Sequence, residues 1–215
     1  MPARSSIPTT GCRRCGTCCS KGGPALHFED LPLVQSGVLS TRDLCTYRVG
    51  EPMHDQIRGE VRLLQKECLK IRPIVGESAC IFYEPRKSSC RLYVHRALEC
   101  RALKCWDTAE LENALRQPRL SRRDLIEEQC ALDELILEHE ARCGCPRLLE
   151  WLDLGTAQAR MALQEARSFD SALRAVLVER DLLDPEELDF LLGRPLDVVI
   201  QGLLRWRKLC STGSR

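Results

Sequence analysis

The residues best suited to chemistry in this 215-residue chain are its 14 cysteines. The first group has the spacing C-x2-C-x2-C-C and comprises Cys12, Cys15, Cys18 and Cys19. Two residues between cysteines let both thiolates turn onto one metal ion or cluster, while the intervening backbone amides can hydrogen-bond the sulfurs. Gly16 suits such a turn, because the turn needs backbone freedom. This run predicts a metal site.

The adjacent pair at the end of the run is harder to place on a single ion. Neighbouring side chains in extended backbone point to opposite faces, so Cys18 and Cys19 are not expected to bind the same tetrahedral ion. Either the two cysteines serve two centres, or one of them is structural or redox-active. The sequence leaves both alternatives open.

A second group of cysteines follows more than sixty residues later. Its members are Cys80, Cys90, Cys100 and Cys105. Together the two groups supply enough thiolates for two four-thiolate sites, or for one site with spare cysteines. Cys45 and Cys68 lie in apolar surroundings, so we expect them to be buried as small hydrophobic residues.

The two groups together resemble a known family. After the first run come C-x-F at Cys80 and C-x-L-Y-x-x-R-x-x-x-C-R from Cys90 to Arg101, a pattern similar to that of the bacterial CxxCxxCC proteins, the YkgJ-type cysteine cluster family. The resemblance covers roughly residues 11–106 and includes Tyr93, Arg96 and Arg101. Ala97 departs from the proline that the family usually has after the arginine.

This resemblance implies a small cytoplasmic protein with a zinc- or iron-chelating domain, and it implies no particular reaction. The candidate metal ligands that the resemblance implies are Cys12, Cys15, Cys18, Cys19, Cys80, Cys90 and Cys100. Cys105 lies outside the core pattern and joins the candidate set by its place beside the second group.

Zinc and iron–sulfur clusters both accept four thiolates, and the triple-spaced first run favours a cluster. Cations next to the cysteines could offset the negative charge of such a centre. They are Arg13, Arg14, Lys21, Arg86, Lys87, Arg91, Arg96, Arg101 and Lys104. We expect a metal-binding protein that holds an iron–sulfur cluster in a redox, cluster-carrying or sensing role. The alternatives are a zinc-stapled module that binds an unknown protein partner, and an enzyme that uses the cluster.

Charge and hydropathy indicate which partners and which cellular compartment to expect. The net charge is +1, with 17 Lys and Arg against 12 Asp and Glu in residues 1–110 and 15 against 19 in residues 111–215. So weak a basic excess does not predict nucleic-acid binding. No apolar stretch follows the first arginines as in a secretory signal, and none is long enough to cross a membrane. We therefore expect a cytoplasmic protein, where cysteines bind metals more often than they form disulfides.

The expected fold is mainly α, with a loop-rich cysteine-cluster region packed on a C-terminal helical half and little strand. We place the division near residue 110, giving a metal-binding domain over 1–110 and a helical extension over 111–215. In the first part, residues 28–36 predict a short helix that ends at Ser36-Gly37. The stretch from Tyr47 to Ile71 fits either strand or helix.

The second part predicts four helices. The first is capped by Ser121 and Asp124 and ends at Gly144. The second runs from Thr156 to about Arg180, with room for an interruption near Phe169. A short third helix follows the cap at Asp184 and ends near Gly193, and residues 196–209 form the last.

Histidines and a late cysteine pair are weaker candidates. His139 and Cys143 share one helix face and could bind a metal or complete a site begun by the first half. We favour a capping histidine, with Cys143 and Cys145 as unrelated thiols. His95 is expected to be structural and is a reserve ligand. The chain has no phosphate loop, dinucleotide fingerprint or nucleophile elbow, so the sequence names no substrate and leaves open whether the protein is an enzyme.

Overall fold

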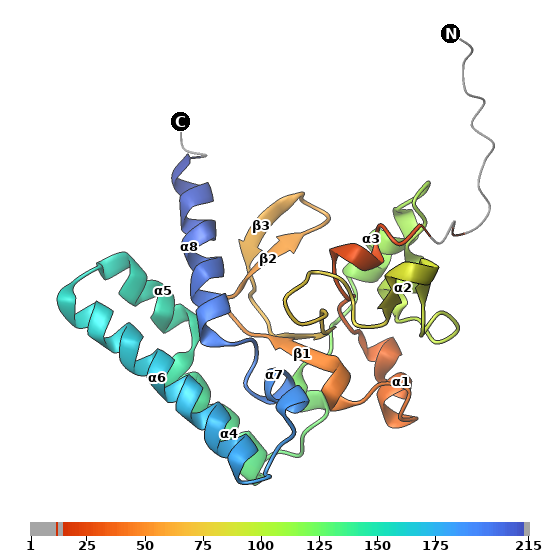
Figure 1. The fold of residues 1–215 in the computed structure, drawn as a ribbon. Coiled ribbons are helices and arrows are strands. Elements are labelled where there is room, and N and C mark those ends of the chain that lie inside the picture. Colours follow the sequence, from red (N-terminus) through yellow and green to blue (C-terminus); the bar gives the residue numbers. More distant parts are fainter. Residues whose placement is uncertain (1–11, 13–14, 213–215) are drawn as a thin grey trace.

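The longer helices gather on one side of the molecule, and the strands separate them from the short helices α1 to α3 (Figure 1). The structure is a computed structural model that describes residue 12 and residues 15–212. About 51% of it is helical and 14% is strand, which confirms the mainly α prediction. Arg13 and Arg14 lie outside the described residues.

The part of the chain that carries the first ten cysteines contains three short helices and three small sheets. The helices are α1 (Leu31–Gln35), α2 (Leu98–Ala102) and α3 (Ala109–Leu115). The strands are β1 (Leu44–Tyr47), β2 (Pro52–Asp55), β3 (Glu60–Leu63), β4 (Cys68–Ile71), β5 (Tyr83–Glu84) and β6 (Ser89–Cys90). They pair antiparallel as β1–β4, β2–β3 and β5–β6. The helix expected over residues 28–36 is confirmed as a 3-10 turn that runs into α1.

Strands, and no helix, form the stretch from Tyr47 to Ile71 that the sequence left open. The β2–β3 hairpin extends the β1–β4 pair, because the Gly50 amide donates to the Leu64 carbonyl at 2.8 Å and the Leu64 amide donates to Glu51 at 2.9 Å between the two sheets. The carboxylate of Asp55 accepts the amide of Ile57 and so shapes the turn of the hairpin.

The second part of the chain is helical, as expected. Its helices are α4 (Ala131–Cys143), α5 (Cys145–Leu154), α6 (Ala157–Glu179), α7 (Leu188–Leu191) and α8 (Leu196–Thr212). Three of the four predicted helices are confirmed as α6, α7 and α8, and α6 passes Phe169 without a break. The sequence analysis missed α5, which begins immediately after Gly144 with a proline in its first turn.

The predicted helix that starts at Ser121 is wrong at its beginning. Ser121 and Asp124 do form the expected capping box, but they cap only a 3-10 turn, and α4 starts at Ala131. Gln129 adopts a positive φ of 59° between them, which a continuing helix does not allow.

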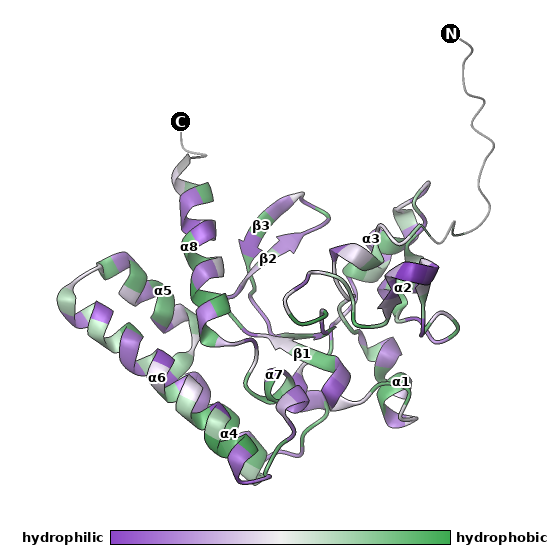
Figure 2. Ribbon diagram, viewed as in Figure 1, coloured by the Kyte–Doolittle hydropathy of each residue, from purple (hydrophilic) through white to green (hydrophobic). Residues whose placement is uncertain are grey.

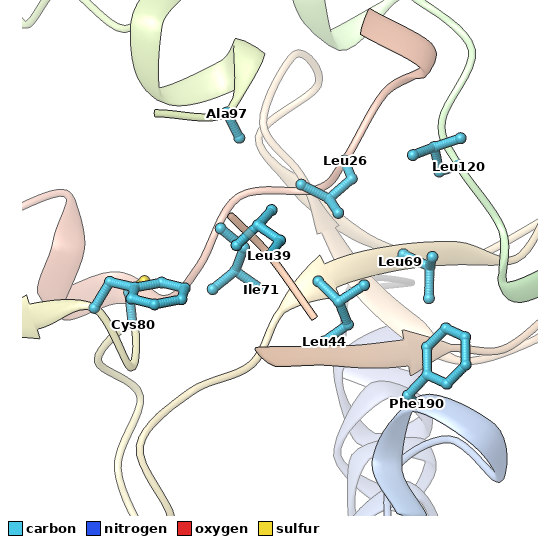
Figure 3. Packing of buried hydrophobic residues seen from close by; sticks show 10 residues of the cluster. Leu26, Leu39, Leu44, Leu69, Ile71, Cys80, Ala97, Leu120 and Phe190 are labelled. Atoms are coloured by element: carbon cyan, nitrogen blue, oxygen red, sulfur yellow. The ribbon is translucent and has the colours of Figure 1, made fainter. Parts of the chain in front are cut away.

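The central core joins the two parts of the chain. Leu44 of β1 and Leu69 of β4 pack with Leu26, and Phe190 of α7 closes the same cluster from the C-terminal part (Figure 3). A second cluster fills the space between α5, α6 and α8, where Leu148, Ala166, Val199 and Leu203 are buried. Apolar and polar residues alternate along α6 and α8, as expected for helices with one packed face (Figure 2).

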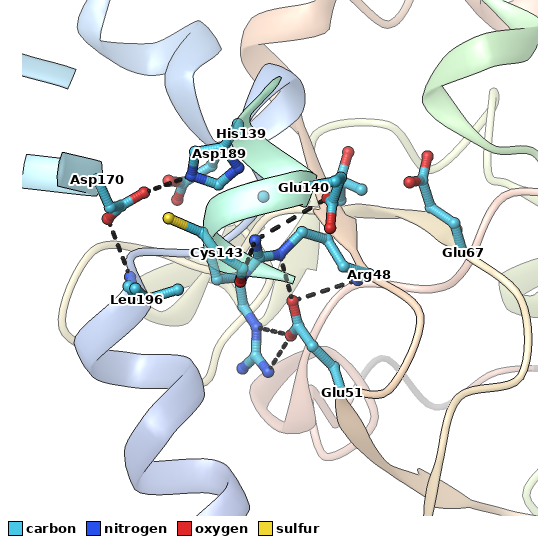
Figure 4. Close-up of polar contacts among 12 residues, drawn as sticks. Arg48, Glu51, Glu67, His139, Glu140, Cys143, Asp170, Asp189 and Leu196 are labelled. Atoms are coloured by element: carbon cyan, nitrogen blue, oxygen red, sulfur yellow. Dashed lines mark hydrogen bonds and ion pairs between the residues drawn. The ribbon is translucent and has the colours of Figure 1, made fainter. Parts of the chain in front are cut away.

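A buried ion network ties the strands to the helices (Figure 4). The fully buried Arg48 donates to the Glu51 carboxylate at 3.3 Å and to the carbonyl of Cys143, at the end of α4, at 3.3 Å. Arg194, between α7 and α8, donates to the same Glu51 at 2.9 and 2.5 Å. Gly193 is required here, because a Cβ would lie 2.8 Å from Cδ of Arg48.

His139 belongs to the packing between helices. It is fully buried in α4, and its Nε2 lies 2.8 Å from the carboxylate of Asp170 on α6. Asp170 also accepts from Arg174 and from the amide of Leu196, the first residue of α8. His139 therefore joins α4 to α6 and does not cap a helix end, which corrects our expectation.

No helix among residues 15–212 combines the length and apolar character that a membrane crossing requires.

Replacing Glu51 tests the ion network. Glu51→Gln leaves Arg48 and Arg194 without their shared counter-charge, and breaking a buried pair in this way costs about 3–5 kcal/mol of the free energy of unfolding. Glu60→Gln removes an exposed carboxylate that pairs with Arg62, so it should change stability by less than about 0.5 kcal/mol. Equal denaturant midpoints for the two variants would contradict this assignment.

The pair of His139 and Asp170 predicts a pH dependence of stability. Burial lowers the pKa of His139, and this outweighs its hydrogen bond to Asp170. The unfolded chain takes up a proton on this residue near pH ~6.5, which the folded protein resists, so the free energy of unfolding falls as the pH drops below that value. His139→Gln keeps an N–H donor without the titration and should flatten this fall. Thermal melts of both proteins between pH 5 and 8 measure it, and parallel curves would refute the effect.

Candidate metal centre

The first cysteine group lies on a tight turn. Gly16 has a φ of +77°, and its carbonyl accepts the amide of Ser20 at 2.9 Å. A 3-10 turn over Cys19–Lys21 follows, with Cys18 in helical backbone conformation. Cys18 and Cys19 therefore do not lie in the extended backbone on which our expectation was based, and whether they bind the same ion stays a prediction. Successive residues of a 3-10 turn are rotated by about 120° and not 180°, and the two sulfurs lie 3.9 Å apart.

The second cysteine group packs directly against the first. The amide of Cys80 donates to the carbonyl of Cys19 at 2.8 Å. Cys90 lies on β6, opposite Tyr83 of β5. The Tyr83 hydroxyl fills the space beside Gly16, where a Cβ would be 1.9 Å from its oxygen. Backbone and side-chain contacts thus hold residues more than sixty positions apart in one place.

Two buried carboxylates position Cys100 on α2. Asp30 accepts the amide of Leu98 at 2.8 Å, at the beginning of this helix. Glu99 accepts the amide of Ala25 at 2.9 Å, and its other oxygen lies 3.2 Å from Nε2 of His27. Burial alone would lower the pKa of His27, but the Glu99 hydrogen bond and charge outweigh it and the pKa is raised. The sequence analysis named no partner for His27 and gave no role to Asp30 or Glu99.

The two arginines of the second cysteine motif, Arg96 and Arg101, shape the loop between Cys90 and Cys100. Arg96 donates to the carbonyl of Tyr93 at 3.0 Å, and its guanidinium lies 4.2 Å from the centre of the Tyr93 ring. Arg101 donates to the carbonyl of Arg96 at 2.5 Å and lies 3.8 Å from Asp30. These residues fix the loop that separates two cysteines.

Six of the eight candidate ligands line one cavity of about 830 Å³. They are Cys18, Cys19, Cys80, Cys90, Cys100 and Cys105. Cys12 and Cys15 are exposed and do not contribute to its wall. Within the described residues, no three His, Cys, Asp or Glu side chains stand close enough to hold a metal ion between them. The structure therefore gathers the sulfurs around a space without placing them at the spacing of a compact single-ion site.

The gathered thiols influence one another electrically. Burial, and then the charge of Cys18, raises the pKa of Cys19 to about 12. Burial also raises the pKa of Cys100, with further contributions from Cys80 and Cys19. Cys80 has a raised pKa as well, from burial and from the charge of Cys90. Because burial and neighbouring thiolates disfavour the ionised forms of Cys19, Cys80 and Cys100, a cation bound among them would favour those forms, and thiolates are strong ligands for zinc and iron.

The remaining candidates lie elsewhere. Cys45 and Cys68 are each about 1% exposed and belong to the core, which confirms their prediction as buried hydrophobic residues. Cys143 and Cys145 are buried in the helical cluster between α5, α6 and α8. His95 is exposed and is not part of the cavity wall.

The cavity wall also holds cations. Of those named in the sequence analysis, Lys21 and Arg96 line it. Lys87 and Lys104 pair instead with nearby carboxylates. Two further cations, Lys70 of β4 and Arg194, line the cavity and were not singled out. The only sequence signal for Lys70 as a cavity residue is its place in a strand. No local sequence pattern identifies Arg194 as a cavity residue.

Comparisons with known proteins agree with this geometry. No curated protein and no solved structure matches the chain. A family model does match, over residues 11–131, and it is that of CxxCxxCC, described as a "putative zinc- or iron-chelating domain". The matched segment holds all eight candidate ligands and more than half of the 215 residues. The chain therefore belongs to the CxxCxxCC family of zinc- or iron-chelating domains.

Proposed function

We propose that this protein holds an iron–sulfur cluster in the cysteine-lined cavity and uses it in a redox, cluster-carrying or sensing role. One observation carries the proposal. Thiols from three separate parts of the chain, at Cys18 and Cys19, at Cys80 and Cys90, and at Cys100, line one space, and burial together with neighbouring thiols raises the pKa of Cys19, Cys80 and Cys100. A cationic inorganic core would offset both the burial and the mutual repulsion of thiolates in this space.

The spacing of the sulfurs favours a cluster over one zinc ion. With Zn–S bonds of about 2.3 Å, the sulfurs of a tetrahedral site lie about 3.8 Å apart. Cys18 and Cys19 have sulfurs at about that separation, 3.9 Å, but no third His, Cys, Asp or Glu of the described residues joins them to form a metal-binding group. A larger core accommodates sulfurs that surround a cavity of about 830 Å³.

The chain's own residues would set the properties of the centre. An iron–sulfur cluster supplies one-electron chemistry when it is bound. Lys21 and Arg96, in the cavity wall, offset part of the negative charge of the thiolates. Cys12, Cys15 and Cys105 remain candidate ligands by their place in the motif, and two exposed thiols at the N-terminal side suit the transfer of a cluster to a partner.

A reducing compartment such as the cytoplasm is the setting that we propose, because there cysteines bind metals more often than they form disulfides. The second candidate function is a zinc-stapled module that binds another protein. The short Cys18–Cys19 contact favours it, since that separation suits two zinc ligands.

Serine substitutions test the proposed ligands. Cys80→Ser, Cys90→Ser and Cys15→Ser should each lower the iron and sulfide content and the visible absorption of anaerobically purified protein, because a serine oxygen replaces a thiolate. They should also destabilise the cysteine region, since metal binding and folding are coupled. Cys68→Ser is the matched control, because Cys68 is buried in the core and does not line the cavity. It should retain the metal and lose only some packing.

Elemental analysis of the unaltered protein separates the two candidate functions. Stoichiometric iron and sulfide support the cluster, whereas stoichiometric zinc without iron supports the second candidate. Protein that contains neither metal, folds equally well with a chelator and is unaffected by Cys80→Ser would overturn both.

The contact between the cysteine groups can be tested at Gly16. Gly16→Ala places a methyl group on the Tyr83 ring and should lower the metal content sharply, because it separates the first group from the second. Gly37→Ala is the matched control. Gly37 has nearly the same φ, +75°, and open space around its Cα, so it shares only the backbone cost of about 1–2 kcal/mol. Equal metal content in the two variants would show that this contact does not matter for the centre.

A further inference from the structure

The cavity extends well beyond the cysteines. From the thiols it continues along Gly22 and Gly23 to the β1–β4 pair and to β2, where Tyr47, Met53 and Lys70 line it. Its volume of about 830 Å³ lies within the range of roughly 300–1,000 Å³ that is typical of small-molecule sites. A metal centre alone leaves this outer end, which we call the Tyr47 lobe, without an occupant.

The Tyr47 lobe is built around one aromatic ring and two cations. The guanidinium of Arg194 lies 4.2 Å from the centre of the Tyr47 ring, and the ammonium of Lys70 lies 5.4 Å from it. The register of the sheet explains the second contact. Lys70 is opposite Cys45, and Tyr47 follows two residues after Cys45 on the same strand face. Arg194 is fixed by its two hydrogen bonds to the fully buried Glu51.

The charges of the wall define what this lobe can bind. Lys21, Lys70, Arg96 and Arg194 line the cavity, and Glu99 is the only carboxylate among the described lining residues. Glu99 is already engaged by Ala25 and His27. Neither Lys21 nor Lys70 takes part in an ion pair within the described chain. Because Arg194 is already engaged by Glu51, Lys70 is the cation that the lobe offers to an anionic ligand.

The two ends of the cavity are electrically distinct. The charges of Lys70 and Arg194 act on the core residue Cys45. The charges that act most strongly on Cys100 are those of other thiols and of Glu99. Lys70 lies with Tyr47 and Arg194 in the Tyr47 lobe, so its ammonium is placed to meet an anion bound there.

We propose that the Tyr47 lobe is a binding site for a small organic anion, in which Lys70 binds a carboxylate or phosphate group and Tyr47 and Met53 contact an apolar or aromatic body. The ligand lies in the same cavity as the cysteines. The site itself goes beyond the metal-binding role and does not depend on which metal the thiols hold. A bound anion at this place would be the substrate or effector of the neighbouring centre.

A matched set of aromatic fragments tests the site on the full-length protein. Benzoate and phenyl phosphate carry the two anionic groups, and benzamide has nearly the same shape without charge. Binding is measured by titration calorimetry at constant ionic strength, with ligand-observed NMR as a second readout. We expect at least one of the two anions to bind and benzamide not to bind. The stronger of the two anions identifies the ligand as a carboxylate or a phosphate.

Lysine variants locate the binding. Lys70→Gln should weaken it about tenfold or more, as expected for the loss of one charge-assisted hydrogen bond. Lys66→Gln is the control, because Lys66 is an exposed lysine four residues earlier that does not line the cavity. Circular dichroism checks that both variants fold, and Lys70→Met, which keeps the apolar stem of the lysine, provides a second probe if Lys70→Gln does not. Binding of benzamide equal to that of the anions, no binding by any fragment, or no effect of Lys70→Gln would overturn the site.

Metal analysis of the same samples keeps this proposal separate from the proposed function. Protein without iron or zinc that still binds an anion through Lys70 would overturn the metal proposal alone. Metal-loaded protein that binds no anion would overturn this site alone.

Discussion

The gathering of ionisable sulfurs in a desolvated space is the constraint around which the structure is built. A buried thiol resists ionisation, and each neighbouring thiolate adds to that resistance. Cys19, Cys80 and Cys100 show both effects, because burial and the adjacent thiols raise the pKa of each. A chain that brings such groups together must hold them by other means, since the sulfurs themselves contribute repulsion once they are charged.

Those other means are contacts between distant segments. The backbone hydrogen bond from Cys80 to Cys19 and the packing of Tyr83 on Gly16 join the two cysteine groups. Asp30 and Glu99 fasten α2 to the segment that precedes α1. Each of these contacts uses neutral groups or buried carboxylates with several hydrogen bonds, so none of the contacts itself requires an ionised sulfur.

Much of the helical fold could be predicted from the sequence, and there are physical reasons why other features could not. The helices over Ala157–Glu179 and Leu196–Thr212 follow from periodicity and from the cap at Thr156. The start of α4 does not, because a capping box is equally compatible with a single 3-10 turn. The placement of Cys18 and Cys19 depends on a backbone conformation that spacing alone does not specify. The division of the chain at residue 110 and the identity of the individual ligands stay predictions.

Local sequence patterns could not predict side-chain partners that are far apart in the chain. His27 and Glu99 are separated by 72 residues, and Arg194 lies 143 residues from Glu51. The family pattern marks Arg96 and Arg101, whose hydrogen bonds are local, but it is silent on Lys70 and Arg194. The residues that shape the outer part of the cavity come from outside the cysteine motifs, so they become visible only in three dimensions.

The shared carboxylate of Glu51 gives the helical half a route into the cavity. One of its oxygens accepts from Arg48, which also reaches the last turn of α4, and the other accepts from Arg194 beside the Tyr47 ring. Displacing α4 or the segment before α8 therefore moves a cation in the cavity wall. The cation beside the Tyr47 ring is thus held in place from the helical half of the chain, through contacts that involve no cysteine side chain.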